Sequence, residues 1–255
     1  IYCVILVVVA RTSRNKSDSS FPSSLDSQSS TMSAFADKNF FEALEDRIAS
    51  SKSLLCVGLD PHGKELKGEV NAFEALKFCK EIIDATYPYV ACYKPNVAFF
   101  EAFGAAGISA LIEVIRLIPA GIPVILDCKR GDIDSTAAAY ATSAYDVITP
   151  SSISAVTLSP YMGWDSVRPF VTEAYENKGA FVLCKTSNPS SGELQARTLS
   201  GGQHVYEGVL GLCNKWNEER TDGHPRVGIV AGATDLLALA RIRSLSPDIW
   251  ILCPG

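Results

Sequence analysis

The sequence predicts an α/β protein, a (β/α)8 TIM barrel whose eighth strand is missing from the given chain. From residue 54 onward, short apolar runs alternate with amphipathic stretches, as in a parallel sheet that helices cover on both faces. A strand followed by a helix recurs about every 25–35 residues, and a (β/α)8 barrel typically takes about 250 residues. A doubly wound sheet is the alternative, but no G-x-G-x-x-G follows the first run.

Seven apolar runs are the candidate strands, and each ends at a polar residue or a Gly/Pro turn. In chain order they are 54–59, 89–95, 122–128, 153–158, 179–184, 226–231 and 248–253. Segments with helical spacing lie between them, at 71–87, 107–118, 134–147, 163–176, 203–219 and 234–245. In the first helix, Phe73, Leu76, Cys79 (or Lys80) and Ile83 fall near one face, which we expect to face the core.

The chain is expected to have two parts: a disordered or non-native leader over 1–31 and the incomplete barrel over 32–255. Residues 1–10 are apolar but too few to span a bilayer, and residues 11–31 are Ser-rich and polar. A signal peptide is the alternative, although no charged segment precedes the apolar run. Met32 is the preferred start of the folded protein.

The composition narrows the class of protein. The net charge is −5, and no basic cluster with interleaved aromatic residues occurs, so a nucleic-acid surface is not expected. Eight Cys occur without a C-x-x-C pair, which favours a reducing compartment and the cytoplasm. A peroxisome-like organelle is the alternative location. The three His have no ligand-like spacing, so neither a zinc site nor a His-based triad is expected.

Charged and polar residues close the apolar runs, where the active site of such a barrel is built. They are Asp60, Lys94, Asp127, Lys129 with Asp132, Ser159, Ser187 and Thr234. Asp127 and Lys129 are two positions apart, so on a strand they share one face. An isolated D-x-K is best interpreted as a structural ion pair. Polar ends on so many strands favour a functional site.

These motifs resemble those of orotidine 5′-monophosphate decarboxylases. The resemblance rests on DCKRGDI at 127–133, with Lys94, LCVGLDP at 55–61, YKPN at 93–96 and KTSNP at 185–189. The resemblance covers about residues 38–255. Within the family, these motifs are similar to those of the branch that includes the decarboxylase half of protist bifunctional UMP synthases. The resemblance implies decarboxylation of orotidine 5′-monophosphate (OMP) to UMP, without metal or organic cofactor, in a homodimer with shared active sites.

The resemblance also implies a role for each matching residue. Lys94, Asp127, Lys129 and Asp132 would form the catalytic array, with Lys129 as proton donor to C6 and Asp127 beside the departing carboxylate. Asp132 and Thr136 would reach into the neighbouring subunit's site. The remaining substrate-binding residues would be Asp60 on a ribose hydroxyl, Ser187 on the pyrimidine amide, and Asn96, Ser159 and Thr234.

Other readings use the same residues. A sugar-phosphate decarboxylase or aldolase of the same superfamily would bind Mg²⁺ through an acidic residue at the position of Lys94. A Schiff-base aldolase would need a lysine in an apolar pocket, unlike Lys129 between two aspartates. The Arg130-Gly131-Asp132 tripeptide matches an adhesion motif, but tripeptides recur by chance. An inactive, non-catalytic fragment is the remaining alternative.

The given chain also departs from the family it resembles. There, the loop after the seventh run and an Arg on the eighth strand hold the substrate phosphate, and the sequence stops at Gly255 before both. We expect the eighth strand and this phosphate site to lie beyond Gly255. A fused orotate phosphoribosyltransferase domain is a further expectation for that region.

Overall fold

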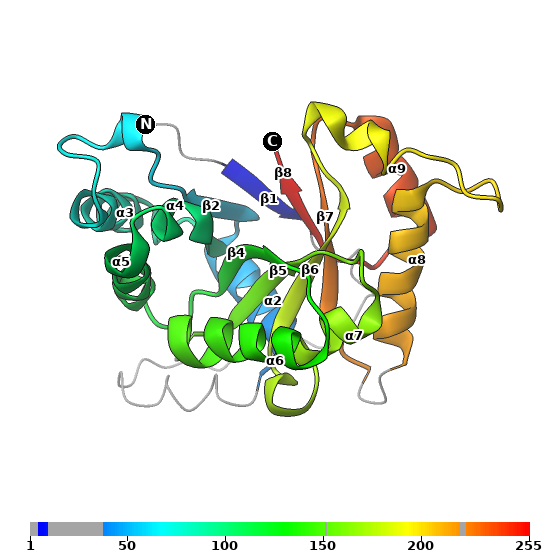
Figure 1. Ribbon diagram of the computed structural model, residues 1–255, viewed down its shortest axis with the longest axis horizontal. Coiled ribbons are helices and arrows are strands. Elements are labelled where there is room, and N and C mark those ends of the chain that lie inside the picture. Colours follow the sequence, from blue (N-terminus) through cyan, green and yellow to red (C-terminus); the bar gives the residue numbers. More distant parts are fainter. Residues whose placement is uncertain (1–4, 10–37, 151, 220–222) are drawn as a thin grey trace.

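The computed structural model describes residues 5–9, 38–150, 152–219 and 223–255. Within these residues, seven parallel strands follow one another around a barrel (Figure 1). They are β2 (Leu55–Leu59), β3 (Cys92–Pro95), β4 (Val124–Arg130), β5 (Ser154–Leu158), β6 (Gly179–Lys185), β7 (Val227–Ala231) and β8 (Ile251–Pro254). All seven predicted strands are therefore confirmed, with ends that differ by a few residues.

An eighth strand closes the barrel from the amino-terminal part of the chain. Strand β1 (Ile5–Val9) lies between β2 and β8 and is antiparallel to both, with Val7 opposite Leu55 on one side and Cys253 on the other. A disordered or non-native leader was expected over 1–31; within that range the structure has a strand at residues 5–9, and the rest lies outside the described residues. A run of Ile, Leu and Val has high strand propensity, and the edges of β2 and β8 offer it unpaired backbone groups.

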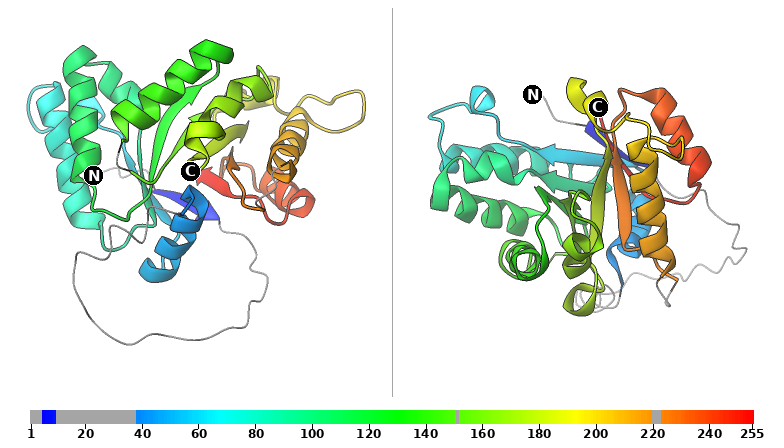
Figure 2. Two further views of the ribbon diagram at one scale, coloured as in Figure 1. Left: turned by 90° about the horizontal axis from the view of Figure 1, so that it is seen from below. Right: turned by 45° about the vertical axis from the view of Figure 1, so that its right-hand side comes forward.

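The helices lie around the outside of the strands (Figure 2). They are α2 (Phe40–Ser51), α3 (Ala72–Thr86), α4 (Val97–Glu101), α5 (Gly104–Leu117), α6 (Asp134–Thr142), α7 (Trp164–Val167), α8 (Val205–Glu218) and α9 (Leu236–Leu245). Among the described residues, no helix is both long and apolar enough to cross a membrane.

Some helices differ from the prediction. Helix α2, which the sequence analysis missed, begins at an Asn39–Glu42 capping box. The helix predicted over 163–176 is broken after α7 into short 3₁₀ turns, the first of which contains Pro169, a residue that disfavours continuation of an α-helix. Phe73 was expected in the core but is 70% exposed, while Cys79 and Ile83 of α3 are buried as predicted.

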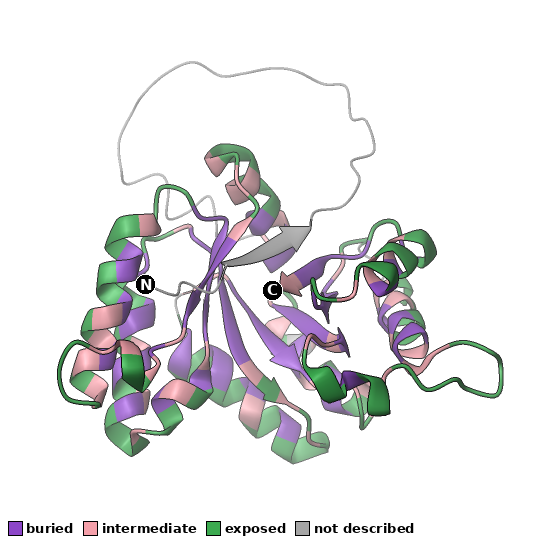
Figure 3. Cartoon of the chain, turned by 90° about the horizontal axis from the view of Figure 1, so that it is seen from above, coloured by how far each residue is buried: buried purple, intermediate pink, exposed green. Residues whose placement is uncertain are grey.

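Two apolar layers support the barrel, whose strands are buried along most of their length (Figure 3). The outer layer lies between strands and helices. The inner layer is a separate cluster that includes Cys92, Ile125, Ala155 and Phe181 from β3 to β6, and Phe41 from α2. Because side chains alternate along a strand, the residues two positions later face the same interior. Those positions on β3, β4 and β5 are polar, and they form the site.

Candidate active site

Lys94 and Asp127 face the interior of the barrel at the carboxyl end of its strands. Each follows an inner-layer residue by two positions: Lys94 follows Cys92, and Asp127 follows Ile125. Both are buried, with 5% and 7% of their surface exposed. Burial of two charges is costly unless they pair, and here they do.

Asp127 lies between two ammonium groups. Lys94 Nζ donates to Asp127 Oδ2 at 2.9 Å, and Lys129 Nζ donates to Asp127 Oδ1 at 2.6 Å. Asp60, which follows β2, places Oδ1 4.0 Å from Lys94 Nζ. The structure therefore brings together four of the residues selected from the sequence, in the alternating order Asp60, Lys94, Asp127, Lys129.

The environment keeps Asp127 and Lys94 charged. Burial acts to raise the pKa of Asp127, but Lys94 and Lys129 outweigh it and lower that pKa to about 2. Burial acts to lower the pKa of Lys94, but Asp127 and Asp60 outweigh it, so that pKa lies above its ordinary value. The pKa of Asp60 is raised, mainly by burial, and its Oδ1 is a buried oxygen without a hydrogen bond.

Lys129 differs from Lys94 in its surroundings. Its side chain is 50% exposed, and its backbone has φ = 44°, a left-handed conformation that few non-glycine residues adopt. The pairing of β4 with β5 changes register between Leu126 and Arg130, which marks a β-bulge around Lys129. Lys129 therefore presents its ammonium group from an irregular end of the strand toward the barrel mouth.

Thr157 on β5 belongs to this site, and the sequence analysis missed it. Its hydroxyl donates to Asp127 Oδ1 at 2.8 Å and accepts from the backbone N–H groups of Lys129 and Cys128. Thr157 lies inside an apolar run, so a search limited to strand ends passes over it. The available signal was its position two residues after Ala155, which places it in the interior.

Asp132 and Thr136 lie apart from this cluster in the same chain. Asp132 Oδ1 accepts from the backbone N–H of Ile133, and within the described residues no ion pair joins Asp132 to Lys94 or Lys129. Thr136 is exposed in the first turn of α6. A single chain thus assembles part of the predicted array.

The other predicted residues lie at the ends of their strands. Asn96 caps α4 by accepting from the N–H of Ala98 at 3.2 Å. Ser159, Ser187 and Thr234 follow β5, β6 and β7, and none of the hydrogen bonds found among the described residues links them to the charged array. The roles of these four residues as substrate contacts stay predictions.

Lys185 at the end of β6 is a buried cation that the sequence analysis did not select. Its Nζ donates to Ser191 Oγ at 3.1 Å and lies 3.4 Å from Asp235 Oδ2. Ser191 belongs to the loop that carries Ser187, and Asp235 follows Thr234. Lys185 therefore joins the two loops in which those predicted contacts lie.

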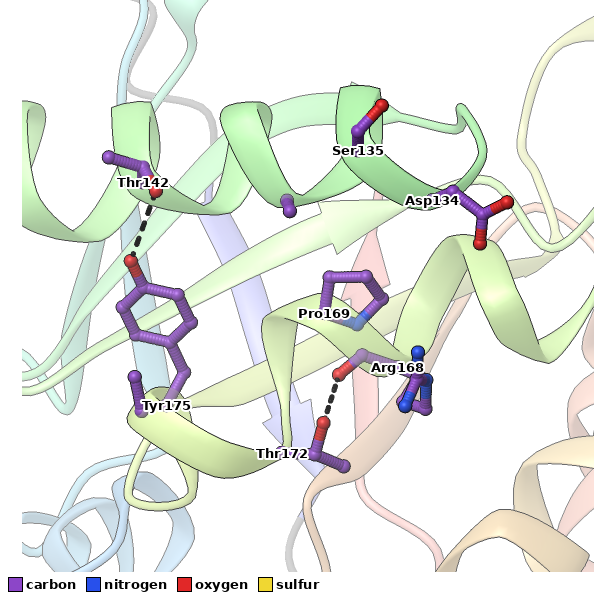
Figure 4. A pocket seen from close by; sticks show the side chains of 9 residues that line it. Asp134, Ser135, Thr142, Arg168, Pro169, Thr172 and Tyr175 are labelled. Carbon is purple, nitrogen blue, oxygen red and sulfur yellow. Dashed lines mark hydrogen bonds between the residues drawn. The ribbon is translucent and has the colours of Figure 1, made fainter.

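A separate hollow of about 470 Å³ lies beside α6 (Figure 4). Asp134 and Ser135 line it from α6, and Arg168 and Tyr175 line it from the segment after α7. It contains neither Lys94, Asp127 nor Lys129, so it is not the site of the charged array. Among the described residues, no group of three His, Cys, Asp or Glu side chains is placed to hold a metal ion.

A parallel barrel with interleaved ammonium and carboxylate groups at the carboxyl ends of its strands is typical of an enzyme that acts through fixed charges. The chain belongs to the orotidine 5′-phosphate decarboxylase / HUMPS family, whose sequence profile matches residues 53–255.

Individual relatives agree with this assignment. An orotidine 5′-phosphate decarboxylase of Roseiflexus castenholzii is 48% identical over 220 residues, which are 85% of this chain and 77% of that protein. The solved OMP decarboxylase of Leishmania donovani is 49% identical, with a TM-score of 0.74 over 85% of this chain and 80% of that one. The UMP synthase of Leishmania donovani is also 49% identical, with a TM-score of 0.74, and the match covers 85% of this chain and 44% of that longer chain.

Proposed function

We infer that this chain decarboxylates orotidine 5′-monophosphate to UMP, the last step of de novo pyrimidine biosynthesis. The observation that carries the inference is the Asp127 carboxylate held between the ammonium groups of Lys94 and Lys129. Family membership and 48% identity to a decarboxylase of this name support the same reaction.

Lys129 is the proposed proton donor. Loss of CO2 from C6 of the pyrimidine leaves a vinyl carbanion, and no ring position can accept its charge as an enolate would. A cation fixed beforehand near C6 stabilises that charge without reorganisation. Lys129 is suited to this role because its ammonium group is held by Asp127 while half of its side chain stays exposed to an incoming substrate. The same group can then protonate C6.

Asp127 and Lys94 are proposed to keep the other charges in place. The low pKa of Asp127 means that an ionised carboxylate would stand beside the departing carboxylate of the substrate. Lys94 would hold Asp127 and contact the ribose, and Asp60 would bind a ribose hydroxyl. The buried Oδ1 of Asp60, which lacks a hydrogen bond, supports this, because a sugar hydroxyl would supply one.

The remaining assignments follow the family resemblance. Ser187 would hydrogen-bond the pyrimidine amide, and Asn96, Ser159 and Thr234 would complete the substrate contacts. Their position after β3, β5, β6 and β7, at the same end of the barrel as Asp127, supports a common site.

We further propose that the active enzyme is a homodimer in which Asp132 and Thr136 complete the partner's site. Two observations support this proposal: Asp132 makes no ion pair with its own chain's Lys94 or Lys129 among the described contacts, and the neighbouring Ile133 is an exposed apolar residue, 44% accessible. A second copy that docks at the start of α6 would cover Ile133.

A cofactor-free reaction is part of the proposal. Lys94 Nζ lies between Asp60 and Asp127, where the magnesium-dependent relatives would need a cation-binding carboxylate, and an ammonium there repels a divalent ion. The test is OMP turnover by the full-length protein before and after dialysis against EDTA. Equal rates are expected. Loss of activity that Mg²⁺ restores would assign the chain to the sugar-phosphate branch of the superfamily.

Two wider features stay proposals. An orotate phosphoribosyltransferase domain fused after Gly255 would make the whole protein a UMP synthase, as in the Leishmania relative, and the transcript beyond that codon tests it. A cytoplasmic location follows from the Cys usage, and fractionation or a fluorescent fusion would distinguish it from a peroxisome-like organelle.

A further inference from the structure

Thr157 has a buried hydroxyl that links β5 to the end of β4, where Asp127 and Lys129 lie. It lies on β5 in the interior layer, with 1% of its surface exposed. Its Oγ1 is 2.8 Å from Asp127 Oδ1, 2.9 Å from the backbone N of Lys129 and 3.1 Å from the backbone N of Cys128. All three partners belong to the end of β4.

The number of donor and acceptor sites on the Thr157 hydroxyl determines the direction of each of these three hydrogen bonds. A threonine hydroxyl has one proton and two acceptor lone pairs. The N–H groups of Cys128 and Lys129 can only donate, so they occupy both lone pairs. The single proton must then go to Asp127 Oδ1, which also accepts from Lys129 Nζ. Thr157 is therefore fully satisfied in one orientation.

The same contacts replace part of the strand ladder. Leu126 pairs with Val156, and the next pair joins Arg130 to Leu158. Three residues of β4 thus lie opposite Thr157 alone, and the amides of Cys128 and Lys129 donate to its side chain. Lys129 within this bulge has φ = 44°, a conformation that costs a non-glycine residue of order 1 kcal/mol and persists only where its surroundings hold it.

We propose that Thr157 is a positioning residue for decarboxylation: its hydroxyl holds the β4 bulge and so directs the ammonium group of Lys129 onto Asp127. The proposal rests on the function inferred above, since the value of this placement lies in proton delivery to C6. It assigns no substrate contact to Thr157.

A threonine suits this role better than its closest substitutes. Its β-branched side chain has few rotamers, so the hydroxyl is preorganised. Valine has nearly the same shape but leaves the backbone N–H groups of Cys128 and Lys129 without their acceptor and removes one of the two donors to Asp127 Oδ1. Serine keeps the hydroxyl and loses only the methyl group. The pair Thr157→Val and Thr157→Ser therefore separates hydrogen bonding from packing.

The control is Thr149→Val, the same change at another buried threonine. Thr149 precedes β5 and is 0% exposed, and its hydroxyl contacts Ala144 O and the Oγ of Ser154 at the amino-terminal end of β5, away from the charged layer. It should lower stability without a specific effect on the chemical step.

Steady-state turnover of OMP is measured for wild type and the three variants of the full-length protein. Loss of a buried hydrogen-bonding partner predicts a roughly 10- to 100-fold lower kcat for Thr157→Val, with KM changed by less than about threefold because Thr157 is not a substrate contact. Thr157→Ser should recover most of kcat, and Thr149→Val should retain it. Equal loss of kcat in the two valine variants, or no loss in Thr157→Val, would overturn the proposal.

Hydrogen–deuterium exchange of the 124–132 peptide gives a second measurement that does not depend on turnover. Faster exchange in Thr157→Val than in Thr157→Ser and Thr149→Val is expected, and unchanged exchange would contradict a positioning role. An inactive wild type would reject the inferred decarboxylase function, while the exchange data would still decide whether Thr157 holds the bulge.

Discussion

Lys94 Nζ donates a 2.9 Å hydrogen bond to Asp127 Oδ2 inside the barrel, where both side chains are less than 10% exposed. A buried pair of this kind is expensive to break, at about 3–5 kcal/mol when one partner is removed. Lys94 and Asp127 therefore hold their geometry before any substrate arrives. The exposed member of the array is Lys129, whose side chain is 50% accessible while its ammonium group is hydrogen-bonded to Asp127.

Replacement of Lys129 by alanine is expected to lower kcat by at least about a thousandfold, because it removes both the fixed cation and the proton source. The exposed side chain should leave the fold intact. Turnover and urea unfolding check the two effects separately. A kcat within about tenfold of wild type, roughly 1.4 kcal/mol of barrier, would show that Lys129 is not the donor.

Mixed dimers test whether the sites are shared. Lys129→Ala and Asp132→Ala chains should each be poorly active, yet an equal mixture should regain about one quarter of wild-type activity, because half of the dimers are mixed and each has one intact site. A mixture of Lys129→Ala with Asp127→Ala is the control, since these residues belong to one chain's site. No gain in the first mixture would place Asp132 in its own subunit's site.

The low pKa of Asp127 predicts an acid-sensitive contribution to stability. Its pKa is about 2 in the folded chain and about 3.9 in an unfolded one, so the folded state is favoured on the order of 2 kcal/mol above about pH 5. This contribution is lost as the pH falls toward 2. Urea midpoints between pH 7 and pH 3 should fall more steeply for wild type than for Asp127→Asn. Asp165→Asn, at an exposed position, should keep the wild-type slope.

Asp60 should behave in the opposite way. Burial raises its pKa, so its ionised form opposes folding, and the penalty grows as the pH rises above the pKa of the unfolded chain. Asp60→Asn should therefore gain stability relative to wild type between pH 3 and pH 7 in urea unfolding. It should also lower kcat/KM roughly 10- to 100-fold if Asp60 binds the ribose. A stability difference that does not change with pH would contradict the buried-charge interpretation.

Gly131 allows the loop after β4 to approach β5. A Cβ at Gly131 would lie 2.8 Å from Ser159 Cβ, closer than real contacts allow. Gly131→Ala should therefore displace the loop that carries Asp132, with a loss of about 1–3 kcal/mol of stability and lower kcat. Gly201→Ala is the control, because nothing lies within 4 Å of its Cβ. Thermal melts and OMP turnover of both variants distinguish a local clash from a general glycine effect.

The sequence predicted the seven parallel strands because each is a continuous apolar run that ends at a polar residue, and both signals are local. It predicted the proximity of Lys94, Asp127 and Lys129 because parallel strands end at one rim. Thr157 was missed because its role depends on the β4 bulge, which no local pattern marks. Strand β1 was missed because its pairing joins segments far apart in the sequence, Val7 with Leu55 and Cys253.

The apolar inner layer also determines how molecules pass through the site. Ile125 and Phe181 are completely buried on the amino-terminal side of the charged residues, and Phe41 of α2 packs against Phe181. Among the described residues, this apolar layer fills the interior beneath the charged array, so OMP, carbon dioxide and UMP are expected to pass through the carboxyl-terminal end of the barrel. UMP still seated at that end blocks the next OMP, so the product should act as a competitive inhibitor, and the rate of nucleotide departure sets an upper limit on turnover.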